Sequence, residues 1–356
     1  MQRLVDKYGP VRHIVLGTVA LEHKATFGAF ASHFPEATVW LEPGQWAFPF
    51  NLPIEFYGLS QRGPRLREIP VPGRSASPGY QYYAQQNPVP EWMTDFDYEV
   101  LGPFRFESVG AFSETAFFHK ATKSLILTDT VCSITKTPPP IVQEDPRSLL
   151  YHSRDSALDP VVDTPQAREK GWRRMIQFGL VFFPSQINVS SVSQAFNEAN
   201  KVPKELRNLG EGGVPGGTLY PWSWNGDSDL VNFQAISQNG KLFCPPILTK
   251  LILDREPTAT LEWADRVAKR FPDMKRIIPC HLNNNVQVRG SKEFLQAFDP
   301  LRSRPGNLVP QRALAEDLAL LQTASDLLTK YHIVAPSQVC DGEPARTKGR
   351  FAAKGA

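Results

Sequence analysis

The segment from Val11 to Pro43 constrains the fold more than any other part of this chain. It contains two short apolar runs, His13 to Leu16 and Thr38 to Leu41, which predict two strands. Apolar side chains recur between them at the spacing of one helical face, which predicts a helix carrying Phe27, Phe30, Ala31 and Phe34 on one side. Strand, loop, helix and strand in this order predict an α/β fold.

A charged loop, Glu22-His23-Lys24, joins the first predicted strand to the helix. A loop between a strand and a helix is where α/β proteins bind ligands, because helix amide groups and the carboxyl ends of strands converge there. This loop places a carboxylate next to an imidazole. It is therefore the first candidate for a functional site.

The composition limits the class of protein. The 356 residues are 41% hydrophobic, which is sufficient for a buried core. The formal net charge is +3 and the basic residues are scattered except in the tail, so no nucleic-acid partner is expected. The longest apolar run, Met175 to Pro184, is about half of what spans a bilayer, so no transmembrane segment is expected. Residues 1–17 show no targeting signal.

The four cysteines are far apart in the chain and form no CxxC pair: Cys132, Cys244, Cys280 and Cys340. This spacing predicts reduced thiols rather than a disulfide framework. Cys280 and His281 are neighbours in a predicted strand, where successive side chains point to opposite faces. A thiol–imidazole pair between them, and hence a cysteine nucleophile, is not expected.

Two further chemically active residues stand at predicted strand ends. Tyr98 to Ser108 predicts a strand, and two apolar runs flanking Lys120 to Lys123 predict a β-hairpin whose second strand ends in Asp129. Thr258 to Arg270 predicts a helix, and the strand that follows it ends in His281. An acid and a histidine that end buried strands are candidates for a site.

Residues 1–300 are expected to form the main domain. Two insertions, at about residues 42–92 and 135–240, are rich in proline and glycine and predict irregular structure. Within the second insertion, only Ala167 to Phe183 has the periodicity of a helix.

Residues 301–340 are expected to form a C-terminal helical extension. Its amphipathic helix, Pro310 to Tyr331, predicts packing on the main domain or on a protein partner. Residues 341–356 show no periodicity and predict a disordered tail.

The order and context of these motifs resemble the metallo-β-lactamase fold, in which a first loop reads HxHxDH, a hairpin ends in a bridging aspartate and a late strand ends in histidine. More closely, VALEHKATFGAF, AFFHKATKSLILTDTV and KRIIPCH resemble the domain-of-unknown-function 4336 family, an uncharacterised plant, algal and cyanobacterial family of that fold. The resemblance covers most of residues 11–300. It implies a metallo-β-lactamase-like αββα sandwich, incomplete at the N-terminus because the opening pair of strands is absent, and it implies a plastid location.

The first loop departs from the pattern of the superfamily. TVALEH places Thr18 and Ala20 where the first two histidines belong and Glu22 where the aspartate belongs, so that only His23 is in register. No histidine lies between Tyr98 and Ser113. The resemblance therefore implies a degenerate metal site.

The residues that remain, His23, Asp129 and His281, provide two imidazoles and one carboxylate. Mononuclear zinc and non-haem iron sites use this ligand type, and one zinc or iron ion is the cofactor that the resemblance implies. Glu22 is then the candidate general base or a support for a ligand. Further candidate site neighbours are Lys24, Glu114 and His119. The alternative is structural: His23 caps the helix, Asp129 binds loop amides and His281 binds backbone.

Three functions are consistent with this sequence. The first is a metal-dependent hydrolase that uses metal-bound water on an ester, thioester or phosphoester, with no particular small-molecule substrate indicated. The second is a non-catalytic protein that keeps the scaffold for binding a small molecule or a protein partner, since a fold does not by itself determine function. The third is an iron-dependent oxidoreductase. Convergence of His23, Asp129 and His281 would favour an enzyme.

Overall fold

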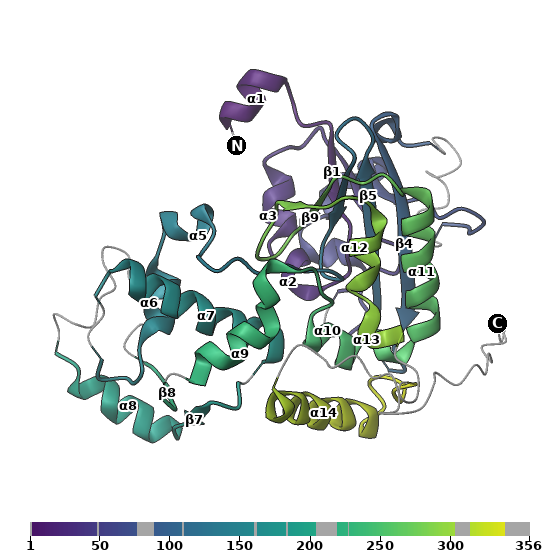
Figure 1. The fold of residues 1–356 in the computed structure, drawn as a ribbon. Coiled ribbons are helices and arrows are strands. Elements are labelled where there is room, and N and C mark those ends of the chain that lie inside the picture. Colours follow the sequence, from purple (N-terminus) through teal and green to yellow (C-terminus); the bar gives the residue numbers. More distant parts are fainter. Residues whose placement is uncertain are drawn as a thin grey trace. The chain divides into compact units, whose positions relative to one another are not determined.

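The computed structural model describes residues 2–47, 50–76, 89–108, 110–159, 162–182, 184–203, 219–226, 228–302 and 314–338. The chain divides into two compact units (Figure 1). The first unit consists of residues 1–131, 252–309 and 326–356, and the second of residues 132–251 and 310–325. Among the described residues, no helix is both long enough and apolar enough to cross a membrane.

The first unit is built from short helices and strands, which confirms the mixed α/β class. In chain order its main elements are α1 (Gln2–Tyr8), β1 (His13–Leu16), α2 (Leu21–Lys24), α3 (Phe27–Ser32), β2 (Thr38–Leu41), β3 (Leu66–Glu68), β4 (Phe96–Arg105), β5 (Ala111–His119), β6 (Ser124–Leu127), α11 (Pro257–Arg270), β9 (Arg276–Pro279), β10 (Val286–Gln287), α12 (Ser291–Gln296) and α13 (Asp299–Arg302). The strands predicted at the start of the chain have the predicted bounds. One prediction was wrong: the charged segment before α3 is a helical turn, α2, in which the Ala25 N–H donates to Leu21 O at 3.0 Å.

Strands β1, β2 and β3 form a parallel sheet in that order. One face of this sheet packs against α3 through a buried cluster that includes Leu16, Phe27, Ala31, Val39 and Leu41. Side chains alternate along a strand, so Trp40 of β2 lies on the opposite face. There it packs with Trp92, Tyr98 and Val100. The central strand is therefore buried on both faces.

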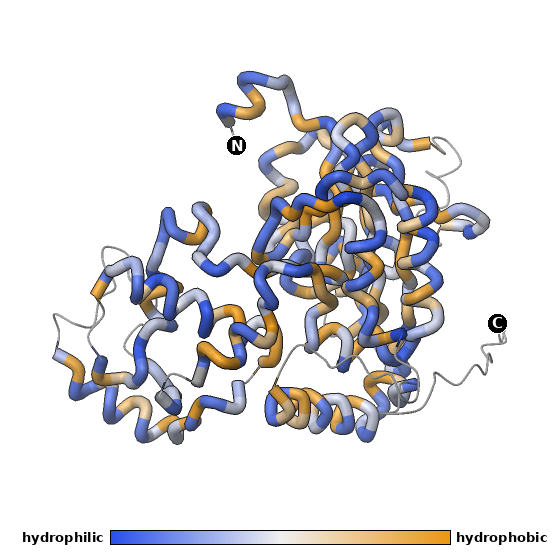
Figure 2. The backbone as a smooth tube through the Cα atoms, in the orientation of Figure 1, coloured by the Kyte–Doolittle hydropathy of each residue, from blue (hydrophilic) through white to orange (hydrophobic). Residues whose placement is uncertain are grey.

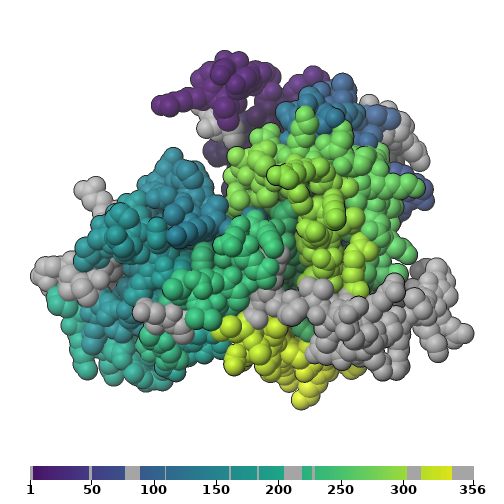
Figure 3. Space-filling model, viewed as in Figure 1, coloured from purple at the N-terminus to yellow at the C-terminus, as the bar shows by residue number. Residues whose placement is uncertain are grey.

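The second sheet has the order β10-β9-β6-β5-β4. Helix α11 lies along β4, where the Trp263 indole donates to Glu99 O at 3.2 Å and Arg270 forms ion pairs with Asp97 and Glu99. Hydrophobic and hydrophilic segments both occur along α11 in Figure 2. Its buried residues recur every three or four positions, as in Thr260, Trp263 and Val267, which is the spacing of a helix with one buried face. In Figure 3 the green to yellow-green segment that contains α11 and α12 lies on the surface of the first unit that faces the viewer. Helices α3 and α11 therefore pack against different sheets of the first unit.

A buried carboxylate joins the two sheets. Glu42, which follows β2, is 1% exposed and accepts hydrogen bonds from the hydroxyl groups of Ser113 and Thr115 on β5. Burial raises the pKa of Glu42 well above its ordinary value, although the two hydroxyl donors oppose this effect. The core of the first unit therefore contains an acid whose ionisation opposes folding.

The second unit is mainly helical. Its elements are α5 (Pro140–Glu144), α6 (Arg147–Ser153), α7 (Pro165–Val181), β7 (Ile187–Val189), α8 (Val192–Lys201), β8 (Trp222–Trp224), α9 (Ser228–Ser237) and α10 (Pro246–Leu251). Helices α6 and α7 approach so closely that a Cβ at Gly171 would lie only 1.8 Å from Leu149 O, so this position requires glycine. Helix α14 (Ala315–Lys330) belongs to the second unit up to Ser325 and to the first unit from Asp326.

The prediction of irregular structure at about 135–240 was wrong for much of this segment, although α7 confirms the helix predicted there. Helix α8 begins after Ser191, whose side chain accepts a hydrogen bond from Gln194 N–H, and this capping signal was not recognised. The insertion expected at about 42–92 likewise contains strand β3. The predicted tail, 341–356, lies outside the described residues.

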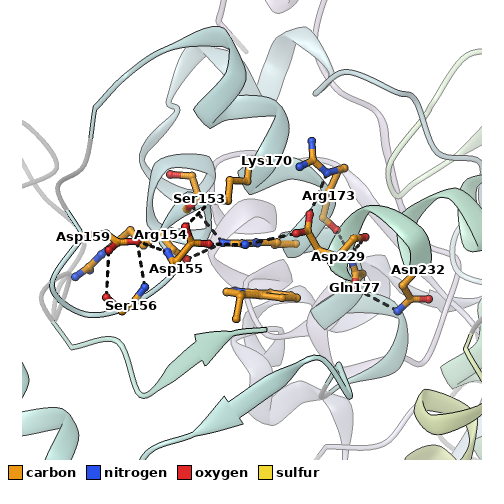
Figure 4. A network of polar contacts seen from close by, with 12 residues as sticks. Ser153, Arg154, Asp155, Ser156, Asp159, Lys170, Arg173, Gln177, Asp229 and Asn232 are labelled. Atoms are coloured by element: carbon orange, nitrogen blue, oxygen red, sulfur yellow. Dashed lines mark hydrogen bonds and ion pairs between the residues drawn. The ribbon is translucent and has the colours of Figure 1, made fainter. Parts of the chain in front are cut away.

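Buried ion pairs hold the helices of the second unit together (Figure 4). Asp229 at the start of α9 is fully buried and accepts a hydrogen bond from Arg173 Nε at 3.0 Å. Arg174, also fully buried, pairs with Asp155 at 2.6 Å and with Asp229 at 3.4 Å. Gln177 donates to the backbone carbonyl of Asp229 at 2.9 Å. The network therefore connects α7 to α9 and to the segment after α6.

The substitution Glu42→Gln tests the cost of the buried acid in the first unit. The pKa of Glu42 in the folded chain exceeds the unfolded value of about 4.3, so its contribution to stability is complete below about pH 4 and is lost as the pH rises through the raised pKa. Glutamine cannot ionise. The free energy of unfolding of Glu42→Gln, relative to the wild type, should therefore increase with pH when urea unfolding is followed from about pH 4 to pH 8.

The control for this measurement is Glu36→Gln, because Glu36 is an exposed carboxylate that pairs with Arg65 on the surface of the same unit. Because an exposed ion pair contributes little to stability, the difference in unfolding free energy between Glu36→Gln and the wild type should be small throughout this range. A constant difference for Glu42→Gln would contradict the predicted effect of burial.

The substitution Asp229→Ala should destabilise the second unit. It removes an acceptor from two arginines and leaves their charge less well compensated in the interior, which costs about 3 kcal/mol. Urea unfolding followed by tryptophan fluorescence measures the change, since Trp172 and Trp224 lie buried in this unit. Asp145→Ala removes the partner of Arg147 from an exposed pair and should leave the unfolding midpoint nearly unchanged. Equal effects of the two substitutions would contradict the prediction.

Candidate metal centre

Three strands bring the candidate ligands to one edge of the first unit. Strands β6 and β9 are parallel neighbours, with Leu127 beside Pro279, so their carboxyl ends lie at the same edge. Asp129 follows β6 by two residues and His281 follows β9 by two residues. The segment after β1 pairs with β5, since Thr115 N–H donates to Gly17 O at 2.8 Å and Val19 N–H donates to Ser113 O at 3.1 Å. This pairing sets the start of α2, which carries His23.

The three ligand atoms form a nearly equilateral triangle. The Nε2 atom of His23 lies 2.9 Å from Asp129 Oδ1, the Nε2 atom of His281 lies 3.0 Å from the same oxygen, and the two nitrogens lie 3.1 Å apart. Two imidazole nitrogens at this distance repel if both present lone pairs to each other. At least one of them carries a proton, or both face a shared cation.

Glu22 completes a group of four possible ligands. One ligand atom from each of Glu22, His23, Asp129 and His281 lies within 4.8 Å of the others. The four residues differ in burial: Asp129 is buried, the two histidines are half-buried and Glu22 is exposed. The site is therefore anchored inside the first unit and open to solvent on the side of Glu22.

Electrostatics stabilise an ion pair at this site. Burial alone would lower the pKa of His23, but its hydrogen bonds with Asp129 and Cys280 raise it to about 10. Burial likewise opposes the ionisation of Asp129, yet hydrogen bonds from His23 and His281 hold its pKa well below the ordinary value. Asp129 is consequently an anion near neutral pH, and His23 supplies the compensating charge. His23 has to lose its Nε2 proton before that nitrogen can bind a metal ion.

Two residues hold Asp129 in place. Thr18, fully buried, donates its hydroxyl hydrogen to Asp129 Oδ2 at 3.1 Å. Glu114, also fully buried, accepts hydrogen bonds from the backbone N–H groups of Thr128, Asp129 and Thr130 at 2.8 to 3.0 Å. Burial and the charge of Asp129 raise the pKa of Glu114 to about 7. Glu114, predicted as a site neighbour, thus contacts the loop that carries Asp129.

Two other predicted neighbours have different surroundings. Lys24 is fully buried and donates to Trp46 O at 2.7 Å, with its ammonium group 4.6 Å from the centre of the indole ring. Burial lowers the pKa of Lys24 to about 8, while Glu22 opposes the shift. His119 hydrogen-bonds to Thr122 at 2.7 Å and pairs with Ser124, at the end of β6 opposite to Asp129. The structure therefore does not bring His119 to the three ligands.

Sequence reasoning missed two contacts of this site. Thr18 was treated only as the substitute for a histidine, although a hydroxyl at that position can donate to a carboxylate. Cys280 was considered only against its neighbour His281, although its interaction with His23 contributes to the raised pKa of that imidazole. Cys132, Cys244 and Cys280 form no disulfide, and Cys340 lies outside the described residues. Alternation along the predicted strand KRIIPCH indicates only that Cys280 and His281 point to opposite faces; the element that Cys280 meets depends on which strands become neighbours.

The fold and the site define a mixed α/β protein with a group of side chains suited to a metal ion. A family model described as a domain of unknown function (DUF4336) matches residues 1–299, and the chain belongs to this family. Searches of curated proteins and of solved structures found no match.

Proposed function

We propose that His23, Asp129 and His281 hold one metal ion, and that the chain is a metal-dependent hydrolase with a metallo-β-lactamase-like αββα fold. The observation that carries the proposal is the triangle of two Nε2 atoms and one carboxylate oxygen with edges of 2.9, 3.0 and 3.1 Å. These atoms come from segments far apart in the sequence, so local structure alone does not explain why they meet.

The donor set fits a zinc or iron ion. Bonds of about 2.05 Å in a tetrahedral arrangement separate ligand atoms by about 3.3 Å, slightly more than the edges of the triangle. Two imidazoles and one carboxylate are ligands that zinc and iron share, whereas calcium and magnesium prefer oxygen. A second ion would need further well-placed ligands, and Glu22, Thr18 and Glu114 add no imidazole to the set. We therefore propose a single ion.

The fold supports the proposed class. The layers run from α3 through the β1-β2-β3 sheet and the five-stranded sheet to α11, and the three ligands follow β1, β6 and β9 at one edge. This order of helix, sheet, sheet and helix is what the αββα architecture requires.

In the proposed reaction the metal ion and the side chains have different roles. An ion held by His23, Asp129 and His281 would supply Lewis acidity and a bound water of lowered pKa. His281, and His23 after loss of its Nε2 proton, would provide imidazole nitrogens, and the buried Asp129 would provide the negative charge. Glu22 is our candidate for the general base, because its carboxylate is exposed and belongs to the same group within 4.8 Å. Esters, thioesters and phosphoesters are the substrate classes that this chemistry serves.

The metal content of the purified chain tests the site. After reconstitution with zinc or ferrous iron, elemental analysis should find about one equivalent of metal in the wild type, and His281→Ala should lose it because only two ligands remain. His332→Ala is the matched control, since the side chain of His332 is 84% exposed and pairs with Glu107. No metal in the reconstituted wild type would contradict the proposal.

The activity test uses Glu22→Gln. If Glu22 is the general base, its substitution should lower kcat on a hydrolysed ester, thioester or phosphoester by about 100-fold or more while the metal content stays at the wild-type value. The control is Glu36→Gln, which removes an exposed carboxylate paired with Arg65. A wild type that binds metal but hydrolyses none of the three substrate classes would instead favour the non-catalytic binding function.

A further inference from the structure

We infer that Thr18 is a positioning residue for the proposed metal centre, because its hydroxyl group holds one oxygen of Asp129 and leaves the other to face both imidazoles. Thr18 donates to Asp129 Oδ2, whereas His23 and His281 both contact Oδ1. The two carboxylate oxygens therefore have separate roles. This inference rests on the proposed function, since it concerns the same ion.

The backbone of Thr18 is fixed independently of this hydrogen bond. Thr18 forms an antiparallel bridge with Glu114, and the residues on both sides of it bond to β5. Residues paired in this way place their side chains on the same face of the sheet. Thr18 and Glu114 consequently approach Asp129 together: the hydroxyl binds its side chain, and the carboxylate binds its backbone N–H at 3.0 Å.

The same hydroxyl also contacts the segment that carries His23. The Ala20 N–H donates to Thr18 Oγ1 at 3.2 Å, and Ala20 immediately precedes α2. One oxygen atom thus accepts from the start of α2 and donates to Asp129. Thr18 thereby couples the position of His23 to the orientation of the carboxylate.

The consequence concerns how Asp129 binds an ion. A carboxylate whose Oδ2 already accepts a hydroxyl hydrogen binds an ion more readily through Oδ1, so the hydrogen bond from Thr18 favours monodentate ligation. Monodentate binding suits a small ion of low coordination number, whereas calcium takes six to eight oxygen ligands and commonly binds carboxylates through both oxygens. Thr18 therefore favours zinc or iron over calcium.

The affinity of the full-length chain for Zn²⁺, measured by competition with a chromogenic chelator, tests this inference. Thr18→Val removes the hydroxyl at nearly constant volume and should weaken Zn²⁺ binding by about 10- to 100-fold, as the loss of a partner behind a ligand does. Thr18→Ser keeps the hydroxyl and should restore most of the affinity. Thr18→Ala removes the same hydroxyl and serves as the second variant if Thr18→Val does not fold.

The matched control is Thr115→Val. Thr115 is also buried in the first unit and also donates its hydroxyl to a carboxylate, but that carboxylate is Glu42. This substitution should lower the free energy of unfolding without changing Zn²⁺ affinity, which separates positioning from general stability. Wild-type affinity in Thr18→Val would overturn the inference and leave the proposed function intact. No Zn²⁺ binding by the wild type would overturn both.

Discussion

The carboxylate of Asp129 is the group around which the first unit has to be arranged. A buried anion is strongly unfavourable unless positive charge and hydrogen-bond donors surround it. His23 and His281 supply donors to Oδ1, and Thr18 supplies one to Oδ2. These donors come from two separate parts of the chain, the segment after β1 and the segment after β9, and Asp129 itself follows β6, so the requirements of one side chain bear on where all three strands end. The contacts that Asp129 needs therefore restrict the fold and build the site at the same time.

Strand β5 connects this constraint to the rest of the unit, because its side chains alternate between two faces. Ser113 and Thr115 point to Glu42, and Glu114 points to the loop of Asp129. Two fully buried acids therefore lie on opposite faces of one strand, and the charge of Glu114 contributes to the raised pKa of Glu42. Each acid accepts several hydrogen bonds, and among the described residues no ion pair is found for either one, so the backbone geometry of β5 determines how both are satisfied.

The parts of the fold that were predicted correctly depend on local patterns. Periodicity predicted the strands at His13 and Thr38 and the helices α7 and α11. The positions of Asp129 and His281 at the ends of predicted strands made them candidate site residues. The contacts of Thr18 and Cys280 could not be predicted in the same way, because each depends on which strands become neighbours. Helix α8 was missed for another reason: Ser191, whose side chain accepts a hydrogen bond from Gln194 N–H, was not recognised as the residue that caps its start.

The absence of histidine at Thr18 and Ala20 does not by itself argue against a metal ion. A second ion would need further ligands, whereas one ion needs three good donors and an open position. The raised pKa of His23, about 10, means that a proton on its imidazole balances the negative charge of Asp129, which lies 2.9 Å from His23 Nε2. A divalent cation would replace this proton and bring one additional positive charge to a site that already contains Glu22 on its exposed side. His23, Asp129 and His281, with Glu22 beside them, thus form a site whose charges are consistent with one ion.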